Sequence, residues 1–352
     1  MASTSSVPLL SSLEFGPDSV ASILFIPGWE MSAKAEAYDF EPIFTATLTE
    51  TTISDEIYKR YKRIYVDLPG MGETPADGVK DLDGIFYRLV SFINFRLGST
   101  RPFLLAGTSC GGYLARAVAR HYQSRVLGLL LRVPVIVPNS EARDVDPFVP
   151  IVRNDKFMAD VISELPIETG FGHDLTLRAI LKGDILVQTP EYVLELKKKY
   201  QEVFLPAMRA ADASVLGPIR NDPARYRLTV PLETPLIQSH PERSGVTDTD
   251  DFSGGLDSTA RNHESPPTSS SSFPVPTLIV TGRQDTDVGY RDACRILSFY
   301  ERATFVTLDH AGHDLPVGEG QTRVFRALVV EWLRRVQDYV AVVGHGIESK
   351  SE

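Results

Sequence analysis

The chain has few of the residues that build disulfide frameworks or metal sites. Its 352 residues include two cysteines, Cys110 and Cys294, and seven scattered histidines. Two cysteines cannot form a disulfide framework, and neither has a partner at the spacing of metal ligands. A phosphate-binding loop of the form G-x-x-x-x-G-K-[ST] is also absent. We therefore expect no bound metal and no cofactor.

Positive charge and long hydrophobic runs are also lacking. The formal net charge is -10, which argues against nucleic acid and anionic membranes as partners. The longest apolar stretch, residues 126–137, is interrupted by Arg132 and Pro134 and is too short to span a bilayer. The first 15 residues have neither the basic region nor the apolar core of a signal peptide. We expect a soluble cytoplasmic protein, and the oligomeric state stays open.

Short apolar runs alternate with amphipathic segments over much of the chain. Six runs have the length and composition of buried strands: 22–26, 63–67, 103–106, 126–131, 276–281 and 303–308. Helical spacing of apolar residues marks segments 40–48, 82–93, 290–300 and 321–340. This alternation predicts an α/β fold with a mostly parallel sheet covered by helices on both faces. Ligands of such folds bind at the carboxyl ends of the strands.

The middle of the chain interrupts this pattern. Residues 140–230 contain helical segments, at 157–164, 191–203 and 206–219, but no buried strand. We interpret them as an inserted helical cap between two parts of the core, residues 1–139 and 273–352. Residues 231–272 are rich in Ser, Thr, Asp and Pro, which predicts a mobile loop.

The segment 102–118, PFLLAGTSCGGYLARAV, reads as a strand, a G-x-S-x-G turn and a helix. This is the pattern of a nucleophile elbow, in which a sharp turn lifts Ser109 above the edge of the sheet. Close packing explains the glycines at 107 and 111. The simpler alternative is a Gly-rich turn in which Ser109 is an ordinary N-cap.

A serine nucleophile needs a base and an acid that orients it. Asp285 follows the strand at 276–281, and His313 follows the strand at 303–308. Asp287 and His310 lie in the same loops and stand as alternatives. We interpret the remaining neighbouring acids as caps or surface charges; they are Asp309 and Asp314.

The order Ser, Asp, His resembles that of the α/β-hydrolase fold superfamily, and the cap indicates its cap-bearing branch. The resemblance covers nearly the whole chain outside 231–272. The family's G-x-x-D-x-x-V pattern fits Gly282, Asp285 and Val288, and Ala311-Gly312-His313 fits its histidine motif. Pro27-Gly28-Trp29 stands where the family has His-Gly-x. The resemblance implies a catalytic triad of Ser109, Asp285 and His313, with an oxyanion hole formed by the backbone N–H groups of Trp29 and Cys110.

The resemblance implies hydrolysis of a small carboxylic ester, lactone or thioester through an acyl-enzyme. Two alternatives stay open: hydrolysis of a C–C bond beside a ketone, and a hydrolase-like protein that binds a small ligand without turnover. A serine at the elbow disfavours dehalogenases and epoxide hydrolases, whose family members use aspartate there.

Other polar residues near the predicted site are candidates for substrate contacts. Glu30 follows the oxyanion turn, and Arg132 interrupts an apolar strand near its carboxyl end. A solvated loop carboxylate and a structural ion pair are the competing interpretations. The pair His173-Asp174 in the cap is equally open. Asp67-Leu68-Pro69-Gly70 imitates the D-x-x-G of nucleotide hydrolases without the phosphate-binding loop that accompanies it.

Overall fold

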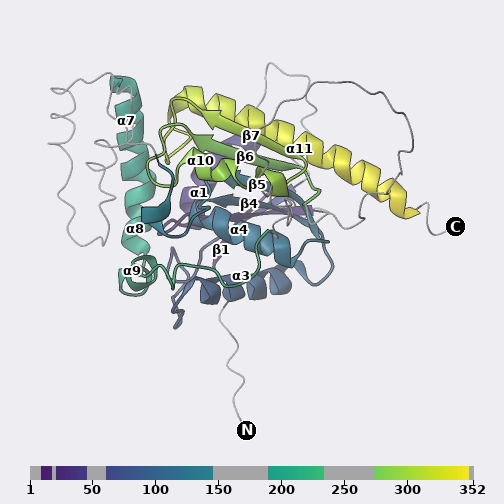
Figure 1. Ribbon diagram of the computed structural model, residues 1–352, viewed down its shortest axis with the longest axis horizontal. Helices are drawn as coiled ribbons and strands as arrows, with labels where there is room; N and C mark the ends of the chain where they lie inside the picture. Colours follow the sequence, from purple (N-terminus) through teal and green to yellow (C-terminus); the bar gives the residue numbers. More distant parts are fainter. Residues whose placement is uncertain (1–8, 18–20, 46–60, 146–188, 234–272, 349–352) are drawn as a thin grey trace, which may run out of the picture.

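The computed structural model describes residues 9–17, 21–45, 61–145, 189–233 and 273–348. A seven-stranded sheet in the order β1-β3-β2-β4-β5-β6-β7 forms its centre (Figure 1). Strands β2 to β7 are parallel, and β1 pairs antiparallel with β3 at one edge. The bounds are Ser12–Phe15 for β1, Ala21–Ile26 for β2, Tyr61–Val66 for β3, Phe103–Thr108 for β4, Val126–Arg132 for β5, Thr277–Gly282 for β6 and Ala303–Leu308 for β7.

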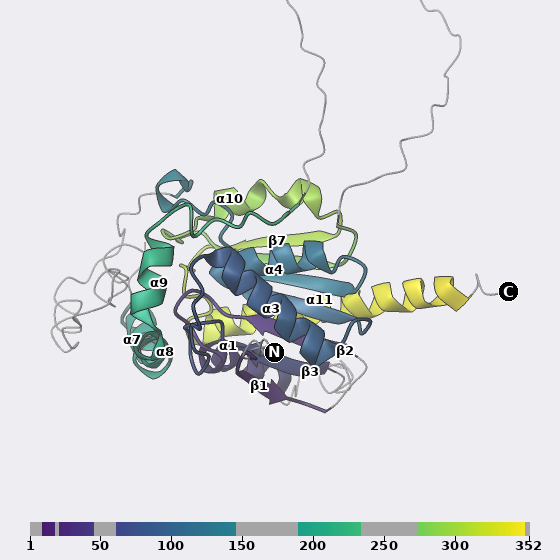
Figure 2. The same ribbon diagram turned by 90° about the horizontal axis from the view of Figure 1, so that it is seen from below.

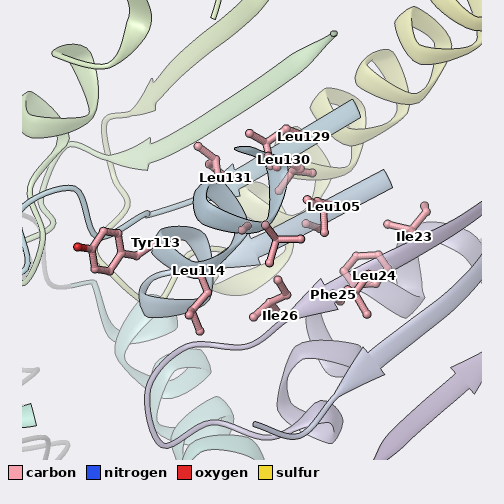
Figure 3. Packing of buried hydrophobic residues seen from close by; sticks show 14 of the residues in the cluster. Ile23, Leu24, Phe25, Ile26, Leu105, Tyr113, Leu114, Leu129, Leu130 and Leu131 are labelled. Carbon is pink, nitrogen blue, oxygen red and sulfur yellow. The ribbon is translucent and has the colours of Figure 1, made fainter. Parts of the chain in front are cut away.

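Helices cover both faces of the sheet (Figure 2). Helices α1 (Ala33–Thr45) and α11 (Gly318–Glu348) pack together on one face, where the rings of Phe40 and Phe325 lie 5.4 Å apart. Helices α3 (Leu82–Leu97) and α4 (Cys110–His121) pack together on the other. The central strands are therefore apolar on both sides, as parallel strands require. Figure 3 shows this core, in which Ile23 to Ile26 of β2 lie beside leucines of β4 and β5.

The α/β fold with a covered, mostly parallel sheet is confirmed, and all six predicted strands are present. Strand β1 was not predicted from the sequence. It is four residues long, it is half exposed, and it pairs on one side only. Such an edge strand lacks the continuous apolar run that identifies the other strands.

Two predicted helices have different bounds in the structure. Helix α1 begins at Ala33 rather than at residue 40, because Glu36 and Asp39 point into the interior and hide the apolar pattern. The Asp67 side chain caps this helix by accepting the N–H of Ala33 at 2.7 Å, so the D-x-x-G turn has a structural role. The predicted helix at 290–300 is two short pieces, α10 (Tyr290–Cys294) and a 3₁₀ turn at Leu297–Phe299.

Between β5 and β6, a column of helices stands at the carboxyl ends of the strands (Figure 1). Helix α7 (Pro190–Lys199) continues through a π-helical turn (Tyr200–Phe204) into α8 (Leu205–Ala210), and α9 (Ala213–Arg220) follows. The break lies at 211–212, where the Asp212 side chain accepts the N–H of Ser214, and not at 204–205 as predicted. The predicted helix at 157–164 and most of the loop at 231–272 lie outside the described residues. Within the described ranges, no helix combines the length and the apolar character needed to cross a bilayer.

Candidate functional site

Ser109 stands on a strained turn between β4 and α4. Its backbone has φ 53° and ψ -117°, a conformation that L-residues rarely adopt and that costs about 1–3 kcal/mol. The surrounding structure holds it there: the Ser109 N–H donates to the carbonyl of Arg132 at 2.9 Å, and its own carbonyl accepts the N–H groups of Gly112 and Val135, each at 3.0 Å. The Ser109 side chain makes no capping hydrogen bond to the helix, so the N-cap alternative does not describe it.

The two glycines of the turn are required by close backbone contacts. A Cβ atom at Gly107 would lie 2.4 Å from the carbonyl oxygen of Gly111. A Cβ at Gly111 would lie 2.1 Å from the carbonyl oxygen of Ile26. Any larger residue would therefore push α4 away from the strands that present Ser109.

His313 contacts both Ser109 and Asp285. Its Nε2 atom lies 3.0 Å from Ser109 Oγ, and its Nδ1 atom lies 3.0 Å from Asp285 Oδ2. The other oxygen of Asp285 accepts the N–H groups of Asp287 and Val288, each at 2.9 Å. Because these bonds fix the carboxylate, Asp285 can hold the imidazole in one orientation. The structure thus brings together the three residues that the sequence analysis selected.

The alternative acid faces the other side of His313, and the alternative base lies at the surface. Asp287 approaches the opposite ring nitrogen, with its Oδ2 atom 3.4 Å from His313 Nε2. His310 is 62 % exposed and pairs with Asp309 at 3.3 Å. Asp309 is therefore a surface charge, as interpreted, whereas Asp314 lines the cavity described below.

Charges around His313 favour its protonated form. Burial opposes protonation, but the carboxylates of Asp285 and Asp287 outweigh it and raise the pKa of His313 to about 10. The surrounding carboxylates thus stabilise the imidazolium form of His313.

The two predicted oxyanion donors flank Ser109. Trp29 ends the turn after β2, and at Gly28 a Cβ atom would lie 3.5 Å from the Cβ of Ser109. Cys110 is the first residue of α4, where the helix dipole is positive. Neither backbone N–H donates a hydrogen bond to a described residue. Burial raises the pKa of the Cys110 thiol to about 11, so this thiol does not compete as a nucleophile.

Ser109 and His313 open into a cavity of about 340 Å³. Trp29 and Thr108 line it from the core. The cap helices contribute three apolar or aromatic side chains, Tyr200, Phe204 and Met208, and two cationic ones, Lys199 and Arg220. A small organic substrate beside Ser109 would therefore contact both the core and the cap.

A buried network of four charges forms one wall of this cavity. Arg132 donates to Glu36 at 2.9 Å and to Asp39 at 2.5 Å. Lys199 donates to Asp39 at 3.0 Å and to the carbonyls of Asp314 and Pro316 at 2.9 and 3.0 Å. Two cations and two carboxylates balance, and all four side chains are at most 7 % exposed.

Arg132 has the ion-pair partners of its competing interpretation, whereas neither interpretation describes Glu30. The guanidinium of Arg132 lines the cavity but is engaged by Glu36 and Asp39, which matches the structural ion pair. Glu30 is buried with φ 59°, and it is not among the residues that line the cavity. Burial raises the pKa of the Glu30 carboxyl, and the charge of Arg220 opposes this rise. His173 and Asp174 lie outside the described residues.

The sequence analysis missed several residues of the cavity. Arg132, within an apolar strand, signalled that buried carboxylates must lie nearby. Nothing identified Glu36 and Asp39 as those partners, and nothing distinguished Lys199 from the lysines at 197 and 198. Arg220 and Tyr226 of the cap carried no signal either. Within the described residues, no cluster of three or more His, Cys, Asp or Glu is arranged to hold a metal.

Comparisons with known proteins identify the family and the fold. The sequence profile of the alpha/beta hydrolase family matches residues 23–327. The monoacylglycerol lipase ABHD6 of Bos taurus is 37 % identical over 78 residues, which is 22 % of this chain and 23 % of that protein; the chain thus aligns with about a quarter of that relative's length.

Solved structures show the same fold. An alpha/beta superfamily hydrolase from Oenococcus oeni PSU-1 superimposes with a TM-score of 0.60 at 21 % identity, covering 92 % of this chain and 96 % of that one. The esterase EaEST from Exiguobacterium antarcticum has a TM-score of 0.53 at 16 % identity, covering 92 % and 95 %.

Proposed function

Because the chain belongs to the alpha/beta hydrolase family, we propose that it hydrolyses a small carboxylic ester, lactone or thioester with Ser109 as the nucleophile. The observation that carries the proposal is the hydrogen-bonded series from Ser109 Oγ through both nitrogens of His313 to Asp285. It opens into a cavity large enough for a small acyl group. The esterase and lipase activities named for similar proteins agree with this choice.

The proposed reaction has two steps. His313 Nε2 accepts the proton of Ser109 as Oγ attacks the carbonyl carbon, and Asp285 stabilises the imidazolium. The N–H groups of Trp29 and Cys110 bind the oxyanion of the tetrahedral intermediate. His313 then gives its proton to the leaving alcohol or thiol, which leaves an acyl-enzyme. Water attacks this ester with His313 again as the base, and the acid and free Ser109 are released.

A fluorophosphonate tests the activated serine directly. Intact mass is measured after incubation of the wild type, Ser109→Ala, His313→Ala and the control Ser91→Ala, which changes an exposed serine on α3. We expect one adduct on the wild type and the control, no adduct on Ser109→Ala, and much slower labelling of His313→Ala. A folded wild type without an adduct would contradict the proposal and favour binding without turnover. Parallel panels of acyl esters and dienones then distinguish ester hydrolysis from hydrolysis of a C–C bond.

A further inference from the structure

We propose that Arg220 binds a carboxylate of the substrate, so that the preferred substrates are esters that carry one negative charge. This inference rests on the proposed function and narrows its substrate class. It follows from the position of Arg220 in the cavity and from its hydrogen-bond donors, which no described residue accepts.

Arg220 ends α9 and lines the same cavity as Ser109 and His313. Its guanidinium carbon lies 4.7 Å from the ring centroid of Tyr226. The Tyr226 ring in turn packs edge-on against Trp29 at 5.2 Å, and its hydroxyl contacts the thiol of Cys110. Stacking on a buried ring restricts the orientation of the guanidinium. Arg220 is therefore held in place beside the residues expected to form the oxyanion hole.

The donors of Arg220 differ from those of the other arginines in the cavity. Arg143 donates to Asp287 at 3.1 Å and to the carbonyl of Val137 at 2.9 Å. Arg132 is engaged in the same way by the buried network. Arg220 approaches Asp287 only to 4.0 Å, which is beyond hydrogen-bond distance, and it donates no hydrogen bond to any described residue. Its side chain is nevertheless only 17 % exposed, so its five N–H donors have restricted access to water.

Most carboxylates around the cavity have a hydrogen-bonded partner other than Arg220. Each other cation has a carboxylate within hydrogen-bond distance: Arg132 and Lys199 have Glu36 and Asp39, Arg143 has Asp287, and His313 has Asp285. Asp287 is already shared by Arg143 and His313. Two other carboxyls lie nearby. The charge of Arg220 opposes the rise in the pKa of Glu30, but no ion pair joins the two in the described structure. Asp314 interacts with His313 and Lys199.

A guanidinium whose donors no described residue accepts fits one carboxylate. A guanidinium recognises the two oxygens of a carboxylate through parallel N–H bonds, and such charge-assisted bonds are strong where water is restricted. A doubly charged phosphate fits less well, because the carboxylate of Asp287, 4.0 Å from Arg220, repels two negative charges more strongly than one. The volume of about 340 Å³ suits a compact dicarboxylic monoester.

Binding to the Ser109→Ala protein tests this without turnover. Titration calorimetry at pH 7.5 compares monomethyl adipate, which carries one carboxylate, with dimethyl adipate, which carries none. We expect the monoester to bind about 10- to 100-fold more tightly. Arg220→Met should abolish this preference, and Arg220→Lys should keep part of it because the charge remains. The control Arg209→Met changes an exposed arginine of α8 and should leave the preference intact.

Three results would overturn the inference: equal binding of the two adipates, binding of neither, or a preference that survives Arg220→Met. If Arg220→Met does not fold, Arg220→Lys takes its place: a preference for the monoester as strong as in the parent protein would contradict the inference. Hydrolysis of the neutral ester 4-nitrophenyl hexanoate by the wild type distinguishes failure of this inference from failure of the proposed function. If the wild type hydrolyses this ester but the monoester binds no more tightly than the diester, only the inference is wrong. If the monoester binds more tightly but the wild type neither hydrolyses the ester nor forms a fluorophosphonate adduct, only the proposed activity is wrong.

Discussion

The Oδ2 atom of Asp287 lies 3.4 Å from Nε2 of His313, the same nitrogen that contacts Ser109 Oγ at 3.0 Å. A second carboxylate thus faces the ring on the side where the proton is transferred. Asp285 holds the other nitrogen. His313 is also within the electrostatic influence of Asp314, while Lys199 and Arg143 hold neighbouring carbonyl and carboxylate groups.

Asp287→Asn should shift the pH dependence of the reaction to lower pH. Only neutral His313 can accept the proton of Ser109, so kcat/KM falls as the pH drops below the pKa of His313. Asp287 contributes to raising this pKa to about 10, and its removal lowers it, by about 1 pH unit. More of the imidazole is then neutral at pH 7, and kcat/KM at that pH should rise.

Profiles of kcat/KM against pH for the wild type, Asp287→Asn and Asp309→Asn check this expectation. Asp309 is 77 % exposed and pairs with His310, so its variant should follow the wild type. An acid limb of Asp287→Asn that stays in place, or moves to higher pH, would show that the charge of Asp287 does not act on His313.

Asp285→Asn, in contrast, should lower kcat at neutral pH. Asp285 fixes the tautomer that presents Nε2 to Ser109, and loss of such an orienting carboxylate typically lowers kcat by about 10⁴-fold. Single-turnover rates of Ser109→Ala, His313→Ala and the double variant should be similarly low, because these residues act as a unit. If kcat falls less in Asp285→Asn than in Asp287→Asn, then Asp287 and not Asp285 is the acid that orients His313.

Most of the core was predictable from the sequence, because each buried parallel strand is a continuous apolar run that no other local structure explains as well. The elbow was predictable because backbone contacts leave Gly107 and Gly111 no alternative. Glu36 and Asp39 were not, since their ion pairs with Arg132 join positions about 95 residues apart and have no local pattern. The role of Arg220 was hidden for the same reason: it depends on which carboxylates other elements already use.

Gly111→Ala should destabilise the fold, whereas Gly217→Ala should change its stability little. The new Cβ at 111 would lie 2.1 Å from the carbonyl oxygen of Ile26, and we expect a loss of about 3 kcal/mol in the free energy of unfolding. At Gly217, within α9, the added Cβ meets no atom within 4 Å apart from its chain neighbours and the backbone of its own helix. Because Pro218 follows and disfavours a helical residue with a Cβ before it, alanine there should change the free energy of unfolding by less than about 1 kcal/mol. Urea unfolding monitored by circular dichroism measures both. Equal effects of the two substitutions would mean that α4 does not pack against β2 as closely as described.

Lys199 connects the cap to the loop that carries His313. From the end of α7, its ammonium reaches Asp39 of α1 and the carbonyls of Asp314 and Pro316. Lys199→Met removes one positive charge from a balanced buried network, and breaking such a network typically costs about 3–5 kcal/mol. The neighbouring Lys198 is exposed, so Lys198→Met is the matched control and should change the free energy of unfolding by less than about 0.5 kcal/mol.

Because the lost bonds also hold the backbone beside His313, fluorophosphonate labelling of Ser109 should slow in Lys199→Met under conditions where the protein remains folded. A destabilised variant with unchanged labelling would mean that Lys199 supports the cap but does not position His313.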